Sequence, residues 1–338
     1  MRSTFLARTV NGPFDDPGVF VDLLHGRRAF LFDLGSIDAL PVRELLRVRD
    51  VFVSHAHMDH FAGFDRLLRL MLGRDFEVRL FGPPDLIERV GHKLQSYTWN
   101  LLAGYAQGLA FVVTELHADG QGRRARFALR DGFARRDEPA VDLPGGTLFD
   151  EPNLRASAVL LDHGIPCLGF ALEEKLRVNV RKNRLIELGL QKGPWLRALK
   201  ELMLAGAPED RPMVARADEA GGLVERRFPL GYLKERLLDV VPGDRIAYVT
   251  DVVWTEANVE AIVELARGAE LLFIEAPFLD RDRDRAAARR HLTAKQAGTL
   301  ARLAGVRRAV PFHFSPRHVA EETALYLEFD AAFGGTSD

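Results

Sequence analysis

Residues 51–68 have the sequence VFVSHAHMDHFAGFDRLL, and this stretch decides the fold. Its first three residues are apolar and predict the end of a buried strand, whereas the apolar spacing after residue 60 predicts a helix. The polar residues between them therefore lie on a strand-to-helix turn. Turns of this kind usually carry the functional site in open α/β sheets.

The polar residues of this turn are those that bind metal ions. His55 and His57 are two positions apart at a strand end, so their side chains point the same way and can hold one ion together. Asp59 and His60 fall on the turn itself, where the backbone can direct both toward a second ion. Imidazole and carboxylate groups are ligands of zinc. A histidine-bearing surface loop is the alternative, but this density of ligands after a core strand favours a metal site.

The His-x-His-x-Asp-His pattern of residues 55–60 resembles the signature of the metallo-β-lactamase superfamily of two-metal hydrolases. The resemblance implies an α/β fold of four layers, an αβ/βα sandwich in which two β-sheets pack together and helices cover both outer faces. It also implies that further metal ligands lie downstream.

Composition sets broader limits. The 338 residues, 47% of them hydrophobic, suffice for a large core, and we expect a single domain spanning 1–338 with insertions. The net charge of −2 does not by itself indicate nucleic-acid binding. A polyanion would therefore have to bind a local patch of basic residues. Cys167 is the single cysteine, which excludes a disulfide within the chain and suits a reducing cytoplasm. We expect no signal peptide and no membrane association, because no apolar run approaches the roughly 20 residues of a membrane span.

Several later apolar runs also end in a potential ligand or acid. Predicted strands end in His163, Asp251 and Glu275, and His313 lies within the last predicted strand, residues 310–318. Asp251 is well placed to bridge two cations. Thr293 is expected to cap a helix. The segment 119–151 is an arginine-rich insertion, for which a polyanion-binding patch and a solvated hairpin are both open interpretations. Residues 206–243 are expected to form a variable connector with one short helix near 230–238.

The resemblance narrows to the ribonuclease Z family, whose members trim the 3′ end of precursor tRNA. That family carries a protruding basic arm with a Gly-Pro pair, which grips the tRNA body away from the active site. Residues 175–205 match this pattern, and the predicted substrate-binding residues there are Arg181, Lys182, Gly193 and Pro194. Lysine and arginine at this density neutralise phosphates without recognising sequence. Without the resemblance, a solvated basic loop would be the simplest interpretation.

Other family motifs also have counterparts here. The family has an aspartate after a strand, a His-Glu-Ala-Thr stretch, a His-Ser-Thr turn and a His-x-Ser-x-Arg-Tyr segment. This chain has Thr250-Asp251, IEAP at 274–277, HLT at 291–293 and HFSPRH at 313–318. The opening departs from the family, since residues 9–17 are acidic where a basic loop is usual.

From these matches the resemblance implies two divalent metal ions, zinc above all, with manganese or iron as alternatives. The implied ligands are His55, His57 and His163 for the first ion, Asp59, His60 and His313 for the second, and Asp251 between them.

The resemblance also implies the chemistry. Two such cations activate a water molecule and clamp the oxygens of an in-line phosphodiester displacement. Asp59 would orient or deprotonate the water, and His291 would donate a proton to the leaving 3′ oxygen while Glu275 holds its imidazole. Ser315 and Arg317 would contact the phosphate, although Arg317 could equally serve as a salt-bridge partner.

The sequence therefore predicts a metal-dependent phosphodiester hydrolase, a ribonuclease Z-like endonuclease acting on precursor tRNA. A two-metal hydrolase of a small phosphodiester, a cyclic nucleotide or another ester is the alternative. A binding protein that keeps the fold without turnover is a third hypothesis, disfavoured by the complete ligand set. The resemblance suggests a homodimer.

Overall fold

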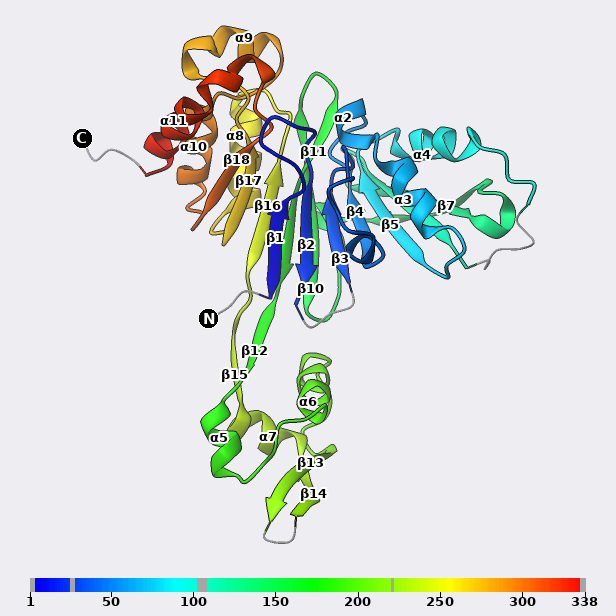
Figure 1. Cartoon of the computed structure of the whole chain (residues 1–338), viewed down its shortest axis with the longest axis vertical. Coiled ribbons are helices and arrows are strands. Elements are labelled where there is room, and N and C mark those ends of the chain that lie inside the picture. Colours follow the sequence, from blue (N-terminus) through cyan, green and yellow to red (C-terminus); the bar gives the residue numbers. More distant parts are fainter. Residues whose placement is uncertain (1–3, 25–27, 102–107, 220–221, 335–338) are drawn as a thin grey trace. The chain divides into compact units, whose positions relative to one another are not determined.

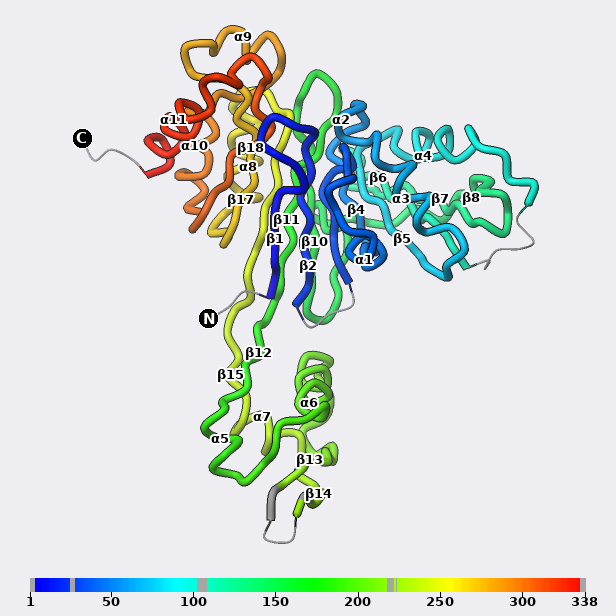
Figure 2. The backbone as a smooth tube through the Cα atoms, viewed as in Figure 1, coloured from blue at the N-terminus to red at the C-terminus, as the bar shows by residue number. Residues whose placement is uncertain are grey.

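A computed structural model describes residues 4–24, 28–101, 108–219 and 222–334. The chain divides into two compact units. The first comprises Met1–Phe149, Ala156–Leu172 and Arg245–Asp338, and the second comprises Asp150–Arg155 and Glu173–Asp244. The smooth path in Figure 2 shows that one continuous excursion of the chain forms most of the second unit.

The first unit contains an eight-stranded sheet. Its strands are β1 (Phe5–Thr9), β2 (Val19–Leu23), β3 (Ala29–Phe32), β4 (Val48–Phe52), β5 (Glu77–Gly82), β6 (Ala110–Leu116), β7 (Gln121–Ala128) and β8 (Arg135–Asp142). They lie in sequence order, and β3 to β6 are parallel while both ends of the sheet are antiparallel. The hairpin β7–β8 occupies the arginine-rich segment, and its turn contains Gly132 with a φ of 62°.

A six-stranded sheet has the order β18-β17-β16-β11-β10-β9. Its strands are β9 (Thr147–Asp150), β10 (Leu154–Asp162), β11 (Pro166–Glu174), β16 (Arg245–Val249), β17 (Leu271–Glu275) and β18 (Ala309–Phe312). Strands β16, β17 and β18 are parallel neighbours. Their carboxyl ends therefore meet at the same edge of the sheet.

Helices cover the outer face of each sheet of the first unit (Figure 1). They are α1 (Val42–Leu45), α2 (Met58–Phe61), α3 (Phe64–Met71), α4 (Leu86–Gln95), α8 (Glu256–Ala266), α9 (Arg283–Ala288), α10 (Ala294–Leu303) and α11 (Glu322–Gly334). The buried faces of α1, α3 and α4 form one core with the first sheet. Those of α8, α10 and α11 form a second core with the other sheet. Among the described residues, none of the helices is long and apolar enough to span a membrane.

Aromatic side chains fill the space between the two sheets. Val51 and Val53 of the β4 region face the helices, whereas Phe52 points the other way, as the two-residue period of a strand requires. Phe52 stacks on Phe32 with ring centroids 4.7 Å apart and contacts Phe170 of the other sheet at 5.3 Å. Each such pair stabilises the fold by about 0.5–1.5 kcal/mol beyond the area it buries. The four-layer αβ/βα sandwich expected from the sequence is confirmed.

The second unit has its own hydrophobic core. Its elements are β12 (Leu176–Val180), α5 (Lys182–Glu187), α6 (Trp195–Leu204), β13 (Pro212–Glu219), β14 (Gly222–Pro229), α7 (Leu230–Leu237) and β15 (Leu238–Pro242). Strand β12 pairs antiparallel with β15, and β13 pairs antiparallel with β14. Trp195, Leu199 and Leu233 are buried at the centre of this core.

The interpretation of residues 206–243 as a connector with one helix was wrong in part. The helix exists as α7, but the β13–β14 hairpin and β15 lie on either side of it. Met213, Ala215 and Ala217 alternate inward along β13, so the buried face of this strand is built from small or flexible apolar residues. By contrast, the predicted N-cap at Thr293 is confirmed, with a complete capping box to Gln296.

Candidate metal centre

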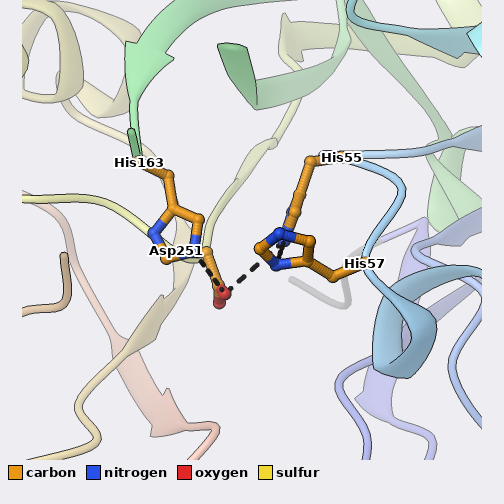
Figure 3. A group of neighbouring side chains, drawn as sticks. All are labelled: His55, His57, His163 and Asp251. Atoms are coloured by element: carbon orange, nitrogen blue, oxygen red, sulfur yellow. Dashed lines mark hydrogen bonds and ion pairs between the residues drawn. The ribbon is translucent and has the colours of Figure 1, made fainter. Parts of the chain in front are cut away.

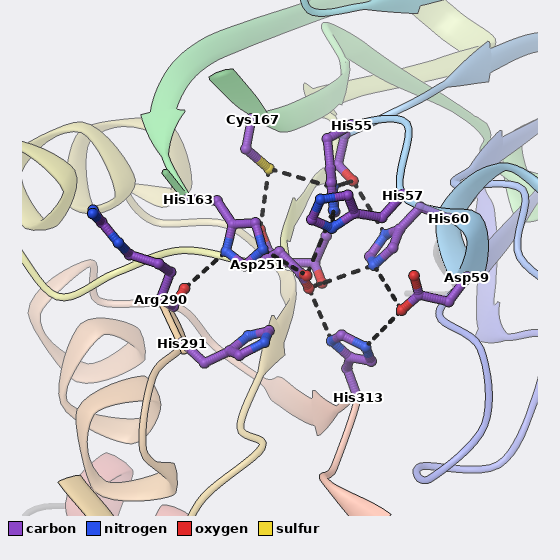
Figure 4. A network of polar contacts seen from close by, with 12 residues as sticks. His55, His57, Asp59, His60, His163, Cys167, Asp251, Arg290, His291 and His313 are labelled. Atoms are coloured by element: carbon purple, nitrogen blue, oxygen red, sulfur yellow. Dashed lines mark hydrogen bonds and ion pairs between the residues drawn. The ribbon is translucent and has the colours of Figure 1, made fainter. Parts of the chain in front are cut away.

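Parallel strand ends bring the predicted ligands together. Asp251, Glu275 and His313 sit at or just after the carboxyl ends of β16, β17 and β18, which are neighbours. The turn after β4 contributes residues 55–60, and the turn between β10 and β11 contributes His163. Figure 4 shows Asp251, His163, His313 and the ligand candidates of the 55–60 turn converging on one place.

The first group comprises His55, His57, His163 and Asp251, whose ligand atoms all lie within 4.8 Å of one another. Figure 3 shows the three imidazoles arranged around the Asp251 carboxylate. Asp251 Oδ2 lies 3.6 Å from His55 Nε2 and 3.3 Å from His163 Nε2. This is the set that the sequence predicted for the first ion, together with the predicted bridging residue.

The second group comprises Asp59, His60 and His313, again within 4.8 Å of one another. The other oxygen of Asp251, Oδ1, lies 2.9 Å from His313 Nδ1 and 3.5 Å from His60 Nε2. The two oxygens of one carboxylate thus face separate groups, which suits a carboxylate placed between two cations.

The hydrogen bonds of two ligand histidines leave a lone pair free for a metal. His163 Nδ1 lies 2.8 Å from the carbonyl oxygen of Arg290, and a carbonyl only accepts, so Nδ1 carries the proton. His60 Nδ1 lies 2.8 Å from Asp33 Oδ2 and donates in the same way. In both rings Nε2 therefore keeps its lone pair and faces Asp251.

Two buried ring nitrogens test whether cations fit this site. His60 Nε2 and His313 Nδ1 are buried, and although both lie near Asp251 Oδ1, neither makes a hydrogen bond of acceptable geometry among the described residues. Burying a polar atom without a partner costs about 1–3 kcal/mol, so such atoms usually have a ligand. Imidazole and carboxylate are the donors that zinc takes in catalytic sites. The residues present therefore fit divalent cations.

Burial and neighbouring charges shift the pKa values of this centre. Burial, followed by the adjacent His60, lowers the pKa of His55 to about 2, which keeps that imidazole neutral. Burial alone would raise the pKa of Asp59, but hydrogen bonds from His313 and His60 outweigh it and hold the carboxyl well below its usual range. Both shifts favour the protonation states that bind cations.

A third group contains Glu275 and His291 beside Asp251 and His313. Glu275 Oε2 lies 2.8 Å from His291 Nδ1, while Oε1 accepts from the backbone N–H groups of Val252 and Leu292 at 3.0 and 3.1 Å. Burial opposes a charge on His291, but the Glu275 carboxylate outweighs it and raises the pKa of the imidazole. The glutamate is thus fixed where it orients His291 and stabilises the protonated form of its imidazole.

Asp33 holds the turn at residues 54–60 in place through hydrogen bonds. It is fully buried and accepts from Ser54 N at 2.6 Å, Ser54 Oγ at 2.7 Å and Tyr248 OH at 2.7 Å, besides His60. These contacts indicate that Asp33 orients the His60 ring and is more than a simple turn residue at the end of β3. The roles of Ser54 and Tyr248 could not be predicted from the sequence, because neither residue belongs to a motif.

Three residues of this region have left-handed backbone. Asp33, Asp251 and His313 have φ values of 57°, 47° and 57°. A non-glycine residue in this conformation costs of order 1–3 kcal/mol and persists where surrounding contacts enforce it. The strain is concentrated where strand ends turn their side chains into the site.

Asn258 ties two ligand-bearing turns together. Its side chain accepts from Asp162 N at 3.0 Å and donates to Asp162 O at 3.0 Å and Val253 O at 2.8 Å. Asp162 precedes the ligand His163, and Val253 follows closely after Asp251. This residue was also missed, because a buried asparagine at the start of a helix is ordinarily no more than a local turn residue.

The remaining predicted site residues fall in two places. Ser315 and Arg317 line a cavity of about 310 Å³ together with His291 and His313. The second unit contains Arg181, Lys182, Gly193 and Pro194, whereas the residues of the metal groups belong to the first unit.

The two-sheet sandwich and its paired histidine–aspartate groups define a metal-dependent hydrolase of the metallo-β-lactamase fold. The crystal structure of the metallo-β-lactamase fold protein YhfI from Bacillus subtilis is similar, with a TM-score of 0.53 and 14% identity over 97% of this chain and 93% of that one. The short form of human tRNase Z gives a TM-score of 0.50 with 20% identity over 93% of each chain.

Sequence comparison identifies the family. No family model matches the chain. Over 319 residues, however, it is 36% identical to ribonuclease Z of Deinococcus radiodurans, covering 92% of this chain and 90% of that protein. The chain belongs to the ribonuclease Z family, whose members are metal-dependent endoribonucleases with a dinuclear metal site.

Proposed function

We propose that this protein is an endonuclease that cleaves precursor tRNA at its 3′ end with two divalent metal ions. The observation that carries the proposal is the convergence of seven side chains, from four separate stretches of the sequence, into two groups that both face Asp251. The proposed ligands are those expected from the sequence: His55, His57 and His163; Asp59, His60 and His313; and Asp251 between them. Zinc is the proposed metal, with manganese or iron as alternatives that this donor set also accepts.

Bound cations would supply Lewis acidity and an activated water for an in-line phosphodiester displacement. Within this frame Asp59, held as a carboxylate, orients or deprotonates the attacking water. His291 donates a proton to the leaving 3′ oxygen from its Nε2, because its Nδ1 is bound to Glu275. Ser315 and Arg317 hold the phosphate, and the planar guanidinium matches phosphate geometry.

The basic residues of the second unit are proposed to hold the tRNA body as the arm of this enzyme. Lys182 and Arg181 are exposed, and Arg181 makes a loose ion pair with Asp239 at 3.9 Å and a long hydrogen bond to Glu235 O at 3.4 Å. Gly193 and Pro194 form the turn before α6, where Gly193 packs against the Trp195 ring. The arm thus offers cations that remain available to phosphates.

The acidic opening is compatible with an RNA substrate. Asp15 accepts from Gly12 N at 3.1 Å within the loop, and Asp16 accepts from Ser36 N at 2.9 Å in the segment after β3, so both carboxylates have partners in the protein. Pro13 O accepts from Phe314 N at 2.6 Å, which anchors the loop beside the strand end that carries His313. The acids therefore serve to shape the loop.

The direct test compares a precursor tRNA with bis(p-nitrophenyl) phosphate as substrates of the zinc-loaded protein. Cleavage of the tRNA at the 3′ boundary of the acceptor stem, with a far higher kcat/KM, is the expected result. Turnover of the small diester alone would contradict the proposal and favour the alternative, a hydrolase of small phosphodiesters.

The arm is tested by combining Arg181→Ala with Lys182→Ala. The double variant should weaken tRNA binding and reduce the salt dependence of log Kd by about 1 per lost phosphate contact. Arg267→Ala on α8 is the matched control, because this exposed arginine is already paired with Glu264 at 2.7 Å. An equal loss in the control would rule out a specific role for the arm.

A homodimer and a cytoplasmic location complete the proposal. The buried single cysteine, Cys167, suits a reducing compartment. Light scattering on the purified zinc-loaded protein measures the oligomeric state directly, and a monomer at micromolar concentration would contradict the first part.

A further inference from the structure

The cavity beside the metal centre has an arginine-rich wall. His291, His313, Ser315 and Arg317 line one part of it, and Arg285 and Arg289 from the α9 region line another. Arg285 and Arg289 are four positions apart, so a helical turn places them on one face. Three guanidinium groups thus surround a space of about 310 Å³ next to the proposed proton donor.

The arginines of the segment 281–290 differ in their partners. Arg281 binds Glu321 at 2.5 Å, Arg283 binds Asp280 at 2.7 Å, and Arg290 lies 3.4 Å from Asp162. Within the described residues, Arg285 and Arg289 have no acidic partner, and neither has Arg317 across the cavity. The three arginines that have acidic partners do not line the cavity, whereas the three that line it have none.

Unpaired like charges around one space repel each other, and an anion between them relieves the repulsion. Arginine is suited to a phosphate because its planar fork donates two parallel hydrogen bonds. We propose that Arg285 and Arg289 bind the RNA phosphate one nucleotide upstream of the scissile bond. This subsite rests on the proposed endonuclease function, which it extends to a specific contact on the substrate.

The position of His291 sets the direction of the strand. Hydrolysis breaks the bond between phosphorus and the 3′ oxygen, water supplies the new oxygen on phosphorus, and the leaving oxygen takes the proton of His291. The nucleoside that carries the leaving oxygen therefore lies on the His291 side of the centre. His291 shares its cavity with Arg285 and Arg289, so the 5′ phosphate of that same nucleoside is the next anion within their reach.

The test uses Arg285→Gln and Arg289→Gln in the zinc-loaded enzyme. Each variant should lose about tenfold more kcat/KM on precursor tRNA than on bis(p-nitrophenyl) phosphate, which has no flanking phosphate. Arg283→Gln is the matched control: it removes one positive charge from the same helix but outside the cavity, and it should change the ratio less than about twofold. Comparable loss in the control would overturn the subsite in favour of a general charge effect.

A modified substrate identifies the phosphate. Precursor tRNA with an uncharged methylphosphonate one nucleotide upstream of the cleavage site should be a poorer substrate for the wild type by about tenfold. On this RNA, Arg285→Gln and Arg289→Gln should cause little further loss, since their partner is already neutral. The assignment is wrong if the variants still lose about tenfold in kcat/KM on this RNA. It is also wrong if their effect disappears only when the methylphosphonate lies downstream of the cleavage site.

A second readout is independent of tRNA cleavage. AMP has a 5′ phosphate and a free 3′ hydroxyl, as the upstream nucleotide of the product does, and should inhibit hydrolysis of bis(p-nitrophenyl) phosphate. The inhibition constant should rise about tenfold in Arg285→Gln and stay near the wild-type value in Arg283→Gln. Unchanged inhibition in Arg285→Gln would refute the subsite, whereas a wild type inactive on tRNA but showing the AMP effect would refute only the endonuclease proposal.

Discussion

Asn258→Asp is the substitution that most sharply tests how the ligand-bearing turns are held. Asparagine and aspartate have nearly the same shape, so packing is unchanged. The new carboxylate can still accept from Asp162 N, but it cannot donate to Asp162 O or Val253 O, which now face a negative oxygen. The change therefore removes two hydrogen bonds and adds a repulsive contact without creating a cavity.

The magnitude follows from these contacts. Each lost hydrogen bond is worth about 1 kcal/mol, and Val253 O also loses its side-chain donor at a site where Asn258 is only 5% exposed. Together with the repulsion we expect a loss of about 3 kcal/mol in the free energy of unfolding. For a protein of this size, that corresponds to a decrease in Tm of about 4 °C.

The loss of stability in this variant should depend on pH. The coupling between protonation and folding determines whether the loss grows or shrinks as the pH rises. Burial beside two carbonyl oxygens raises the pKa of the new carboxyl above the value of about 3.9 that it has in the unfolded chain. Stability from such a group is present below the unfolded pKa and is lost as the pH rises through the folded pKa. The variant should therefore be closest to the wild type in acid and fall further behind above about pH 4.

Thermal unfolding of both proteins in EDTA across this pH range measures the effect without a contribution from metal binding. Zinc affinity, measured by competition with a chromophoric chelator at neutral pH, should fall as well, because the turns that precede His163 and follow Asp251 are no longer tied. A variant with wild-type Tm and wild-type zinc affinity at neutral pH would refute this reasoning.

Three further outcomes are expected. His291→Ala should retain its zinc content, measured by atomic emission, while kcat on precursor tRNA falls about 100-fold; loss of zinc would show that the residue is a ligand. Tyr248→Phe removes the 2.7 Å hydrogen bond to Asp33 and should lower zinc affinity about tenfold, with unchanged affinity contradicting a role for Asp33 in orienting His60. Prolonged dialysis against a chelator should abolish hydrolysis and added zinc should restore it, whereas activity in the metal-free protein would disprove metal dependence.

The pattern of residues 55–60 predicted a metal site from the residues alone, because imidazole and carboxylate groups follow a buried strand there. His163, Asp251 and His313 were predicted as ligands through the family resemblance, and the parallel order of β16, β17 and β18 explains why the last two meet at one edge of the sheet. Tyr248 and Asn258 could not be found this way, since their partners lie 215 and 96 residues away and nothing local marks the contact.

The missed hairpin has a different cause. The β13–β14 hairpin has an exposed face of charged residues, and prolines and glycines bound it, so its composition is that of a loop. The alternation of Met213, Ala215 and Ala217 was the available signal, but alanine contributes little to a hydrophobic pattern. Strands built on small residues are recognised only once their core partners, such as Leu233, are known.

The pairing of β12 with β15 has a consequence for how this enzyme could have acquired its second unit. Leu176 is opposite Pro242, so the excursion starts and finishes at adjacent points of one two-stranded ribbon. A segment with such joined ends can be exchanged, lengthened or lost during evolution without rethreading the strands on which the histidines sit. Related genes can then change substrate choice through the excursion, while the catalytic site in the sandwich diversifies separately.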